Sequence, residues 1–510
     1  MFLVNNEEMR LLDQATIHEW GIPSLILMEN AGIAIFQQLQ KDIIPLEDKR
    51  ILIICGCGNN GGDGLVLARQ LWQHGHQSVV VAMLYEGEKN LSEEAAVNFQ
   101  IIENLGIKYI DIDNLQKLNI LKAQLSFSDV AIDCLFGTGL TRGLSNMMME
   151  AIQIINAKKI TRIAIDIPSG LNGSSGEILG DCVQADFTYT LGFPKQGQFL
   201  KESANKVGML RVLSIGIPEE TAERAGIQGR LLEETWLRKM WLKREPHSHK
   251  NKFGHIGIVA GRIGMGGACV LASKAAFRAG AGVVTALVDK GIFTTVATAI
   301  PEVMAQPIEW PNPAAISSLL EKTNVQIIGP GMGTSEEKQN VLFELLKRAT
   351  GTVIIDADAL NILAEGDGEP LRKTQAQCIL TPHPGEMARL LGKSILEIQE
   401  NRLSLTRKMA RQFKCTVVLK GHHTIIASPT GAFSINPHDS VALATAGSGD
   451  VLTGIIAAFA ANGLEAYDAA CAGVLLHGLS GEYLASQKGV VSSMATDIID
   501  SLSDIVRKFE

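Results

Sequence analysis

The sequence predicts an α/β protein that folds as two domains. The chain has 510 residues, which exceeds the usual size of one hydrophobic core and indicates at least two domains. In both halves, short continuous apolar runs alternate with helical patterns, as is typical of strands buried in a parallel sheet and of the helices that cover them. The 50 glycines favour many tight turns between such strands and helices.

The first half begins with two helical patterns, 7–20 and 23–39, separated by Gly21 and Pro23. Apolar runs then follow at the spacing of a doubly wound sheet. Strands are predicted at 50–55, 78–83, 129–134, 162–167, 186–191 and 209–215. A glycine-rich loop over 56–64 separates the first strand from a helix predicted at 65–74.

This loop formally matches the dinucleotide fingerprint Gly-x-Gly-x-x-Gly, but the match is weak. The fingerprint requires an acidic residue about 20 residues further on, whereas Glu86 lies about 30 residues after Gly56. Asn59, Asn60 and Asp63 also place side-chain oxygens where a pyrophosphate would meet bare N–H groups. Such a loop suits a hard cation or a sugar hydroxyl instead.

Two more strands of the first half end in an aspartate followed by a glycine-containing loop. Asp133 precedes the loop 136–143, and Asp166 precedes the loop 168–172. The carboxyl ends of strands face the ligand crevice in doubly wound sheets, so these loops and the 56–64 loop can converge on one site. The alternative is that each aspartate simply caps a helix.

The pattern changes between the halves to a charged segment bounded by prolines. We place the first domain at 1–222, the junction at 223–250 and the second domain at 251–510. The junction has a helical pattern over 231–243, and its tryptophans, Trp236 and Trp241, are expected to be exposed and able to dock on either half.

The second half repeats the alternation of strands and glycine-containing loops. Strands are predicted at 255–259, 325–328, 352–355, 378–380, 416–419, 424–427 and 431–435. Pro382 and Pro384 fix the backbone around His383 and aim its side chain. Lys420 is a candidate contact for a phosphate or an adenine edge.

The stretch 444–454 is the strongest candidate for an anion site. Successive N–H groups at a helix start carry positive partial charge, and Gly447 and Gly449 let a phosphate approach without meeting a Cβ. Asp450 lies where a general base for phosphoryl transfer is needed. The alternative is a tight turn with a capping aspartate. The chain has no Gly-x-x-x-x-Gly-Lys-Ser/Thr loop, so this is not the phosphate site of a P-loop NTPase.

Composition indicates a well-packed protein, with 46% hydrophobic and 20% charged residues. The net charge of −8 argues against a nucleic-acid partner, because phosphate backbones are bound mainly by Lys and Arg. The first ten residues lack a signal-peptide core, and every apolar run is interrupted well before about 18 residues. The eight cysteines lie mostly in apolar runs without metal-ligand spacing. We therefore expect a cytoplasmic protein with no membrane partner and with reduced cysteines.

Motifs in both halves resemble those of the bifunctional NAD(P)H-hydrate repair enzymes, and the resemblance covers nearly all of the chain. The motifs of the first half are 27–32, 58–64, 133–140 and 166–170, and those of the second are 265–268, 356–361, 380–386 and 444–454. The resemblance implies a Rossmann-like three-layer epimerase domain followed by a ribokinase-like three-layer dehydratase domain.

The resemblance also implies the activity and its ligands. The first domain would interconvert the R and S forms of NADHX and NADPHX, which are nicotinamides hydrated at C6. The second would dehydrate the S form while converting ADP to AMP and phosphate. It further implies small-molecule substrates, potassium in the epimerase domain, and ADP with Mg²⁺ as the co-substrate. Separately, we expect a homo-oligomer, but no set of residues in the sequence marks its interface.

Site residues are carried over by the same resemblance. The hydrate contacts would be Asn59, Asn60, Gly61, Gly62, Asp63, Gly137, Thr138, Gly139, Leu140, Thr141, Arg142, Gly143 and Asp166 in the first domain, and Ala268, Gly331 or Gly333, His383 and Asp450 in the second. Potassium would be held by Asn60, Asp133 and Ser169. The adenine nucleotide would be held by Lys420, Gly421, His422, His423, Thr424, Gly447 and Gly449.

Two aspartates are the candidate catalytic groups. Hydroxide is a poor leaving group and phosphate a good one, so we hypothesise that Asp450 takes the proton of the substrate hydroxyl as it attacks the β-phosphate of ADP. Asp166 is the candidate acid/base at the C6 hydroxyl in the epimerase.

One segment departs from the family pattern, and two alternative functions remain open. The segment 436–443 lacks the expected Thr-Gly-Asn type of turn, which puts local substrate or metal contacts there in question. The competing enzyme is a ribokinase-like small-molecule kinase fused to a ligand-binding domain. A non-catalytic nucleotide-sensing protein is the alternative outside enzymes.

Overall fold

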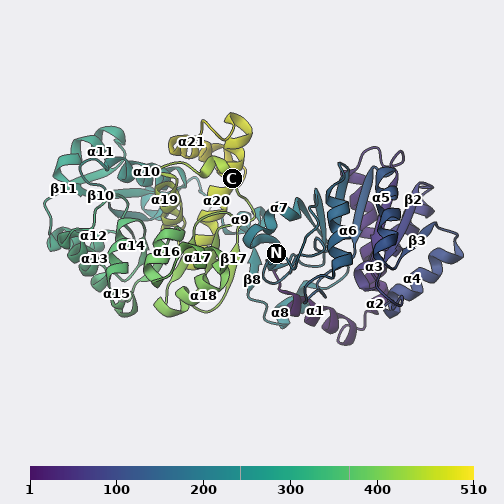
Figure 1. The fold of residues 1–510 in the computed structure, drawn as a ribbon. Helices are drawn as coiled ribbons and strands as arrows, with labels where there is room; N and C mark the ends of the chain where they lie inside the picture. The colour runs from purple at the N-terminus through teal and green to yellow at the C-terminus, as the bar shows by residue number, and fades with distance from the viewer. Residues whose placement is uncertain (242, 367) are drawn as a thin grey trace. The chain divides into compact units, whose positions relative to one another are not determined.

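The computed structural model describes residues 1–241, 243–366 and 368–510. It divides the chain into two compact units, Met1–Gln228 and Gly229–Glu510, which are coloured from purple to teal and from teal to yellow in Figure 1. Each unit has its own sheet and its own hydrophobic cores. The segment expected to join the domains, 223–250, is thus divided between the two units.

The first unit is built on a seven-stranded sheet in which all strands are parallel. Its strands are β1 (Ile51–Cys55), β2 (Val79–Leu84), β3 (Tyr109–Ile112), β4 (Val130–Cys134), β5 (Thr161–Ile165), β6 (Phe187–Leu191) and β7 (Met209–Leu213). The order is β3-β2-β1-β4-β5-β6-β7, so the direction of winding reverses between β1 and β4. A ligand crevice is expected at this reversal.

Helices cover both faces of this sheet (Figure 1). They are α1 (Asn6–His18), α2 (Ser24–Asp42), α3 (Asn59–Gln73), α4 (Glu93–Asn104), α5 (Leu118–Ser126), α6 (Asn146–Asn156), α7 (Ala204–Val207) and α8 (Glu219–Arg224). Ile53 of β1 points to the core shared with α2, α3 and α4, whereas Leu52 points to the core shared with α5 and α6. Because strands alternate their side chains between faces, the apolar run of β1 supplies both cores.

The structure differs from the sequence prediction in where helix α3 begins. The glycine-rich residues after β1 were predicted to form a loop up to Gly64, but the helix already begins at Asn59. The glycines are needed there for close packing: a Cβ on Gly61 would collide with the carbonyl oxygen of Gly56, and one on Gly64 would lie 2.7 Å from the sulfur of Cys55. The motif therefore places the first turns of α3 directly against the end of β1.

The second unit is built on a ten-stranded mixed sheet. Its strands are β8 (Gly229–Leu231), β9 (His255–Val259), β10 (Val283–Asp289), β11 (Met304–Ile308), β12 (Val325–Ile328), β13 (Thr352–Ile355), β14 (Gln377–Leu380), β15 (Thr416–Leu419), β16 (Ile425–Ala427) and β17 (Phe433–Ile435). The order is β11-β10-β9-β12-β13-β14-β15-β16-β17-β8, with β16 antiparallel to both neighbours and the other pairs parallel. The winding reverses between β9 and β12.

Helices also cover both faces of the second sheet (Figure 1). They are α9 (Glu234–Met240), α10 (Gly266–Arg278), α11 (Phe293–Ala299), α12 (Pro313–Lys322), α13 (Glu336–Arg348), α14 (Asp358–Glu365), α15 (Glu369–Lys373), α16 (Pro384–Leu391), α17 (Ile395–Glu400), α18 (Arg402–Phe413), α19 (Ser448–Ala461), α20 (Ala466–Lys488) and α21 (Ala495–Val506). Ile256 and Ile258 of β9 face a core shared with α10, α19, α20 and α21, whereas Gly257 between them lies against Leu319 of α12.

The junction segment is more structured than its sequence indicates. Residues 229–231 form β8, which pairs with β17 in the second sheet. The helix expected over 231–243 is α9, which ends at Met240, and Leu242 lies outside the described residues. The prediction that the tryptophans are exposed is wrong: Trp236 and Trp241 are half-buried against the core of the second unit, where Trp241 stacks on Phe509 with ring centroids 5.3 Å apart.

The cysteines are free thiols, as predicted, and all except the half-buried Cys57 are buried. Within the described parts of the chain, no helix combines the length and the apolar character needed to cross a lipid bilayer.

Candidate active sites

The first candidate site lies at the carboxyl ends of β1, β4 and β5, where the winding of the first sheet reverses. Three segments meet there: the start of α3, the loop after Cys134 and the residues after Ile165. A Cβ on Gly137 would lie 3.1 Å from Asp166 Oδ2 and 3.5 Å from Asn60 Cβ. The structure therefore brings together the three groups of residues that the sequence analysis assigned to one crevice.

Asp133 and Ser169 form a buried polar pair in this site. The Ser169 hydroxyl donates to Asp133 Oδ1 at 2.6 Å, and the Ser169 backbone N–H donates to Oδ2 at 2.8 Å. The same hydroxyl oxygen accepts from the Phe136 N–H at 2.9 Å, which ties the loop after β4 to the end of β5. Burial raises the pKa of Asp133 to about 6 even though both Ser169 bonds favour the ionised form.

Asn60 adds an amide whose hydrogen-bonding groups are unpaired within the described residues. Its Oδ1 and Nδ2 are buried without a protein partner, which is costly unless a ligand satisfies them. With Asp133 and Ser169 it supplies carboxylate, hydroxyl and amide oxygens, the donor set of a hard cation. Among the described residues no group of three His, Cys, Asp or Glu side chains is arranged for a transition metal.

Asp166 has an unusual backbone and a strong partner. Its φ is +65°, a left-handed conformation that is uncommon for residues other than glycine. Its side chain forms an ion pair with the ammonium group of Lys195, which is almost completely buried. Lys195 was not predicted from the sequence; the available signal was a lone lysine between Pro194 and Gln196, shortly after the buried strand β6.

The rest of the predicted hydrate loop is more open. Thr138 is half-buried and Leu140 is buried, while Gly139 and the residues 141–143 are exposed at its tip. Burial raises the pKa of Asp63, with the Asp166 carboxylate adding to the effect. The loop can therefore contribute exposed residues to a ligand site, and Asp63 of α3 can contribute a buried carboxyl.

The second candidate site is a cavity of about 720 Å³ at the carboxyl ends of β13, β14 and β15. Its walls are the segment 436–445, the first turn of α19 and one face of α20. Many of the predicted site residues line it, namely His383, Lys420, Gly421, His422, Thr424, Gly447, Gly449 and Asp450. Its volume lies within the range of small-molecule sites.

The start of α19 is open to an anion, as the glycine pattern predicts. Gly447 caps the helix with a φ of +87°, and a Cβ there would also collide with Leu271. A Cβ on Gly449 would be 3.3 Å from Lys420 Nζ. A bare helix N-terminus next to an ammonium group is a favourable position for a phosphate.

Asp450 has the protonation behaviour of a general base. Burial, and after it the Asp356 carboxylate, raise the pKa of its carboxyl from an ordinary 3.8 to about 7, against the opposing charge of Lys420. A base with a pKa near the working pH is the most effective, because it is available and still strong enough to take a proton.

Lys420 is held by buried carboxylates. Its ammonium group lies 2.7 Å from Asp356 Oδ1 and 3.9 Å from a Glu386 oxygen. The other Asp356 oxygen accepts from the Thr453 hydroxyl at 3.0 Å, which joins β13 to α19. Asp356 was recognised in a motif but was given no role, although it orients the lysine and destabilises the ionised form of Asp450.

Two histidines in the cavity have different environments. His383 caps α16, where its Nδ1 accepts from the Gly385 N–H at 3.0 Å, and its side chain is half exposed. Burial, with the charge of Lys420, lowers its pKa. His477 of α20 was not predicted; its Nε2 lies 3.1 Å from the Ser448 hydroxyl, and burial lowers its pKa to about 4.

The atypical segment 436–443 is fastened by contacts between histidines and carboxylates. Asp439 pairs with His422 and accepts from the His423 N–H at 3.0 Å. His438 Nδ1 lies 3.0 Å from a carboxylate oxygen of Glu482. The residues that replace the expected turn thus bind the segment to the loop after β15 and to α20, and several of them line the cavity.

Ala268, in the first turn of α10, and Gly331 and Gly333, which follow β12, are not among the residues that line this cavity. A Cβ on Gly331 would be 3.2 Å from Ala268 Cβ, so these two adjoin each other. The Gly333 N–H donates to Asp358 at 2.8 Å.

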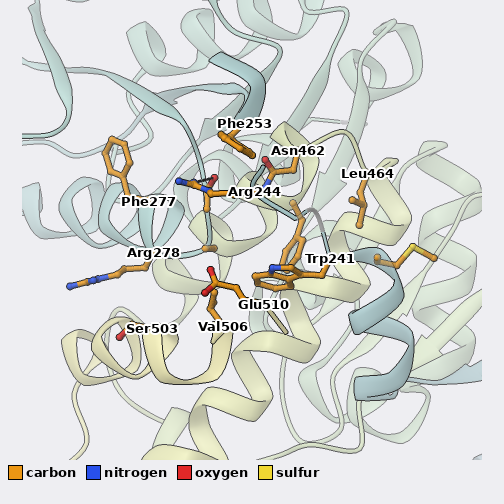
Figure 2. A pocket seen from close by; sticks show the side chains of 14 residues that line it. Trp241, Arg244, Phe253, Phe277, Arg278, Asn462, Leu464, Ser503, Val506 and Glu510 are labelled. Carbon is orange, nitrogen blue, oxygen red and sulfur yellow. Dashed lines mark hydrogen bonds between the residues drawn. The ribbon is translucent and has the colours of Figure 1, made fainter. Parts of the chain in front are cut away.

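A separate hollow of about 350 Å³ in the second unit contains none of the predicted site residues. Figure 2 shows that Trp241, Phe253 and Val506 frame it. Arg244 donates to the Gly280 carbonyl at 2.9 Å and stacks on the Phe253 ring at 4.3 Å, so its charge is already engaged. Phe253 and Gly280 lie just before β9 and β10, so this hollow is at the amino ends of these strands, whereas the candidate site is at carboxyl ends.

Comparison with known proteins gives a consistent result for both units. A family model described as NAD(P)H-hydrate dehydratase matches residues 256–504, and one described as YjeF-related protein N-terminus matches residues 24–197. Among solved structures, an ADP/ATP-dependent NAD(P)H-hydrate dehydratase from Bacillus subtilis, co-crystallised with ATP and Mg²⁺, is similar with a TM-score of 0.50 and 29% identity, covering 55% of this chain and 99% of that one. A ribokinase-like superfamily protein from Enterococcus faecalis gives a TM-score of 0.50 and 28% identity, covering 55% of this chain and 96% of that one.

Full-length relatives carry both units in one chain. A protein of Moorella thermoacetica named bifunctional NAD(P)H-hydrate repair enzyme Nnr is 39% identical, covering 100% of this chain and 97% of the relative. The protein of the same name from Escherichia coli is 34% identical, covering 95% and 90%.

Proposed function

Because the chain belongs to the family of bifunctional NAD(P)H-hydrate repair enzymes, we propose that its two units carry out successive steps of one repair. The first unit epimerises the R and S forms of NAD(P)HX. The second dehydrates the S form to NAD(P)H while ADP is converted to AMP and phosphate. The observation that carries the second assignment is Asp450, a half-buried carboxyl with a pKa near 7 in the open first turn of α19.

In the dehydratase step, the C6 hydroxyl of the hydrate attacks the β-phosphate of ADP and Asp450 accepts its proton. AMP leaves, and the hydroxyl becomes a phosphate ester. The C6–O bond then breaks, phosphate departs, and the loss of a proton from C5 completes the double bond of NAD(P)H. The N–H groups of the first turn of α19 and the Lys420 ammonium stabilise the charge on the transferred group; each well-placed donor contributes on the order of 10² to 10³ in rate.

In the epimerase step, Asp166 accepts the proton of the C6 hydroxyl. The C6–N1 bond opens to an aldehyde, and the proton is returned to N1. Closure of the ring on the opposite face of the aldehyde, with the proton transfers reversed, inverts C6. Asp166 lies at the meeting point of the three loops, so it is positioned to serve both directions.

Asn60, Asp133 and Ser169 fit a potassium ion, and we assign them to it. The unpaired buried amide of Asn60 and the buried Asp133 carboxylate, which is bonded to Ser169, are the support for this assignment. A bound potassium ion would supply positive charge for an anionic part of the substrate. ADP with Mg²⁺ is the proposed co-substrate of the second unit. The remaining residue roles implied by the family resemblance belong to the same proposal, and the homo-oligomeric state and cytoplasmic location stay predictions.

The test is to supply the purified chain with mixed R and S NADHX plus ADP and to follow NADH absorbance. Conversion of the whole mixture is expected if both units act. Conversion that stops when the S form is used up would show that the first unit is not an epimerase. If ATP instead yields a stable phosphorylated compound without NADH, the alternative of a small-molecule kinase is correct.

A further inference from the structure

Lys195 is a buried lysine that the mechanism above does not use. Only 1% of its surface is exposed. Its ammonium group has three acceptors: Asp166 Oδ1, the Leu191 carbonyl at 2.8 Å and the Thr190 hydroxyl at 3.2 Å. All three ammonium protons are thus engaged, and two of the acceptors are neutral groups of β6. The charge is therefore compensated mainly by Asp166.

The two oxygens of Asp166 have different surroundings. Oδ1 accepts from Lys195 and, at 3.3 Å, from the Leu191 N–H. Oδ2 points to Gly137, where an added Cβ would lie 3.1 Å from it. The Asp166 carbonyl oxygen accepts from Gln198 Nε2 at 2.9 Å, which fixes the left-handed backbone. One carboxylate oxygen is therefore anchored, and the other faces the proposed substrate crevice.

The lysine itself is held by the amino-terminal segment. Val4 forms an isolated parallel bridge with Lys195, and its N–H donates to the Pro194 carbonyl at 3.0 Å. The Gln196 N–H donates back to the Val4 carbonyl at 2.8 Å. Because the backbone on both sides of Lys195 is paired, its side chain has a defined direction.

Two further carboxyls share this environment. Asp13 of α1 and Asp63 of α3 interact electrostatically with both Lys195 and Asp166. Burial raises the pKa of Asp13 to about 6, and Lys195 opposes the change. Burial raises the pKa of Asp63 as well. In such a group of acids, a lysine bonded to one member favours ionisation of that member.

We propose that Lys195 is a positioning residue of the epimerase: it holds Asp166 as a carboxylate by its Oδ1 and leaves Oδ2 as the atom that accepts the proton of the C6 hydroxyl. The proposal rests on the epimerase function proposed above. It assigns to Lys195 no contact with the substrate and no proton transfer of its own.

The experiment measures conversion of R-NADHX to S-NADHX without ADP, by chromatography of the two forms, with the spontaneous rate subtracted. Lys195→Met should move the acid limb of the pH profile upward by about one to three pH units, so the enzymatic rate on that limb should fall by about 10- to 1000-fold and the rate at neutral pH by less. Part of the lost rate should therefore return as the pH is raised to 9. Lys195→Arg, which keeps the charge, should retain most of the rate, and Lys201→Met at an exposed lysine nearby should match the unsubstituted chain.

Dehydration of S-NADHX with ADP by the second unit serves as the internal control and should not change. If the wild-type chain fails to epimerise R-NADHX, the proposed function fails. If the wild type is active and Lys195→Met loses the same factor at every pH, or loses nothing, the role of Lys195 is refuted.

A second measurement covers the case in which Lys195→Met does not fold. Asp166→Asn combined with Lys195→Met removes both charges and leaves no uncompensated buried ion. Because Lys195 acts only through Asp166, the double variant should epimerise at the same residual rate as Asp166→Asn alone. A further drop would show that the lysine acts in some other way and would overturn the proposal.

Discussion

Replacing Asp450 with asparagine should remove dehydratase activity and make the second unit more stable at neutral pH. Asparagine has nearly the shape of the protonated acid, but it cannot accept a proton. A general base contributes about 10² to 10⁴ in rate, so kcat for S-NADHX should fall by at least about 100-fold. Binding of ADP should persist, because Gly447, Gly449 and Lys420 remain in place.

The stability effect follows from the raised pKa of Asp450. The folded protein binds this proton more tightly than the unfolded chain, so the contribution of Asp450 to stability is complete below pH 3.8 and is lost as the pH rises to about 7. A pKa change of about three units corresponds to about 4 kcal/mol. At pH 5 the folded protein has already lost the free energy that corresponds to roughly one pKa unit. About 3 kcal/mol of the stabilisation is then lost between pH 5 and pH 7.

The assay combines calorimetry of the unfolding transition of the second unit with steady-state kinetics. Asp450→Asn should be more stable than the wild type at pH 8, and the advantage should shrink at pH 5. Asp468→Asn is the matched control, because Asp468 is a half-buried acid of α20 outside the cavity; its kcat should stay normal. Near-normal turnover by Asp450→Asn, or a stability difference that is the same at both pH values, would refute the reasoning.

Three further predictions test other parts of the structure. Asn60→Ala should raise the potassium concentration needed for half-maximal epimerisation. If the epimerisation rate of the wild type does not change when potassium is replaced with tetramethylammonium, the proposed ion site is wrong. Gly61→Ala should lower the free energy of unfolding of the first unit by about 1–3 kcal/mol in chemical denaturation, whereas Gly58→Ala, where a Cβ meets nothing within 4 Å, should cost clearly less. A chain of residues 229–510 should dehydrate S-NADHX, whereas 251–510, which lacks β8 and Trp241, should be markedly less stable; equal stability would argue against a structural role for the junction.

The central strands were predictable because burial on both faces leaves a continuous apolar run, as in 51–55 and 352–355. The edge strands β3 and β11 are partly exposed and lack that run, so the sequence analysis did not place them. β10 was also missed, although it has the apolar pattern of a central strand. β8 could not be predicted, because its three residues become a strand only through pairing with β17.

The residues of the candidate sites likewise include some that the sequence could predict and some that it could not. Asp133, Asp166 and Asp450 were predictable because each lies at the end of a strand or in the first turn of a helix, next to a local glycine pattern. Lys195 and His477 were not, because their roles depend on partners far away in the chain. The early start of α3 likewise depends on contacts of its glycines with β1 and β4, which no local propensity reveals.

The pairing of β8 with β17 has a consequence for how the chain is made. As the protein emerges from the ribosome, residues 1–228 can complete their sheet from what has already been synthesised. Residues 229–231 must instead wait with open backbone hydrogen bonds until 433–435 have been added. We therefore expect the epimerase unit to be folded while the dehydratase unit is still incomplete, with β8 closing the second sheet near the end of translation.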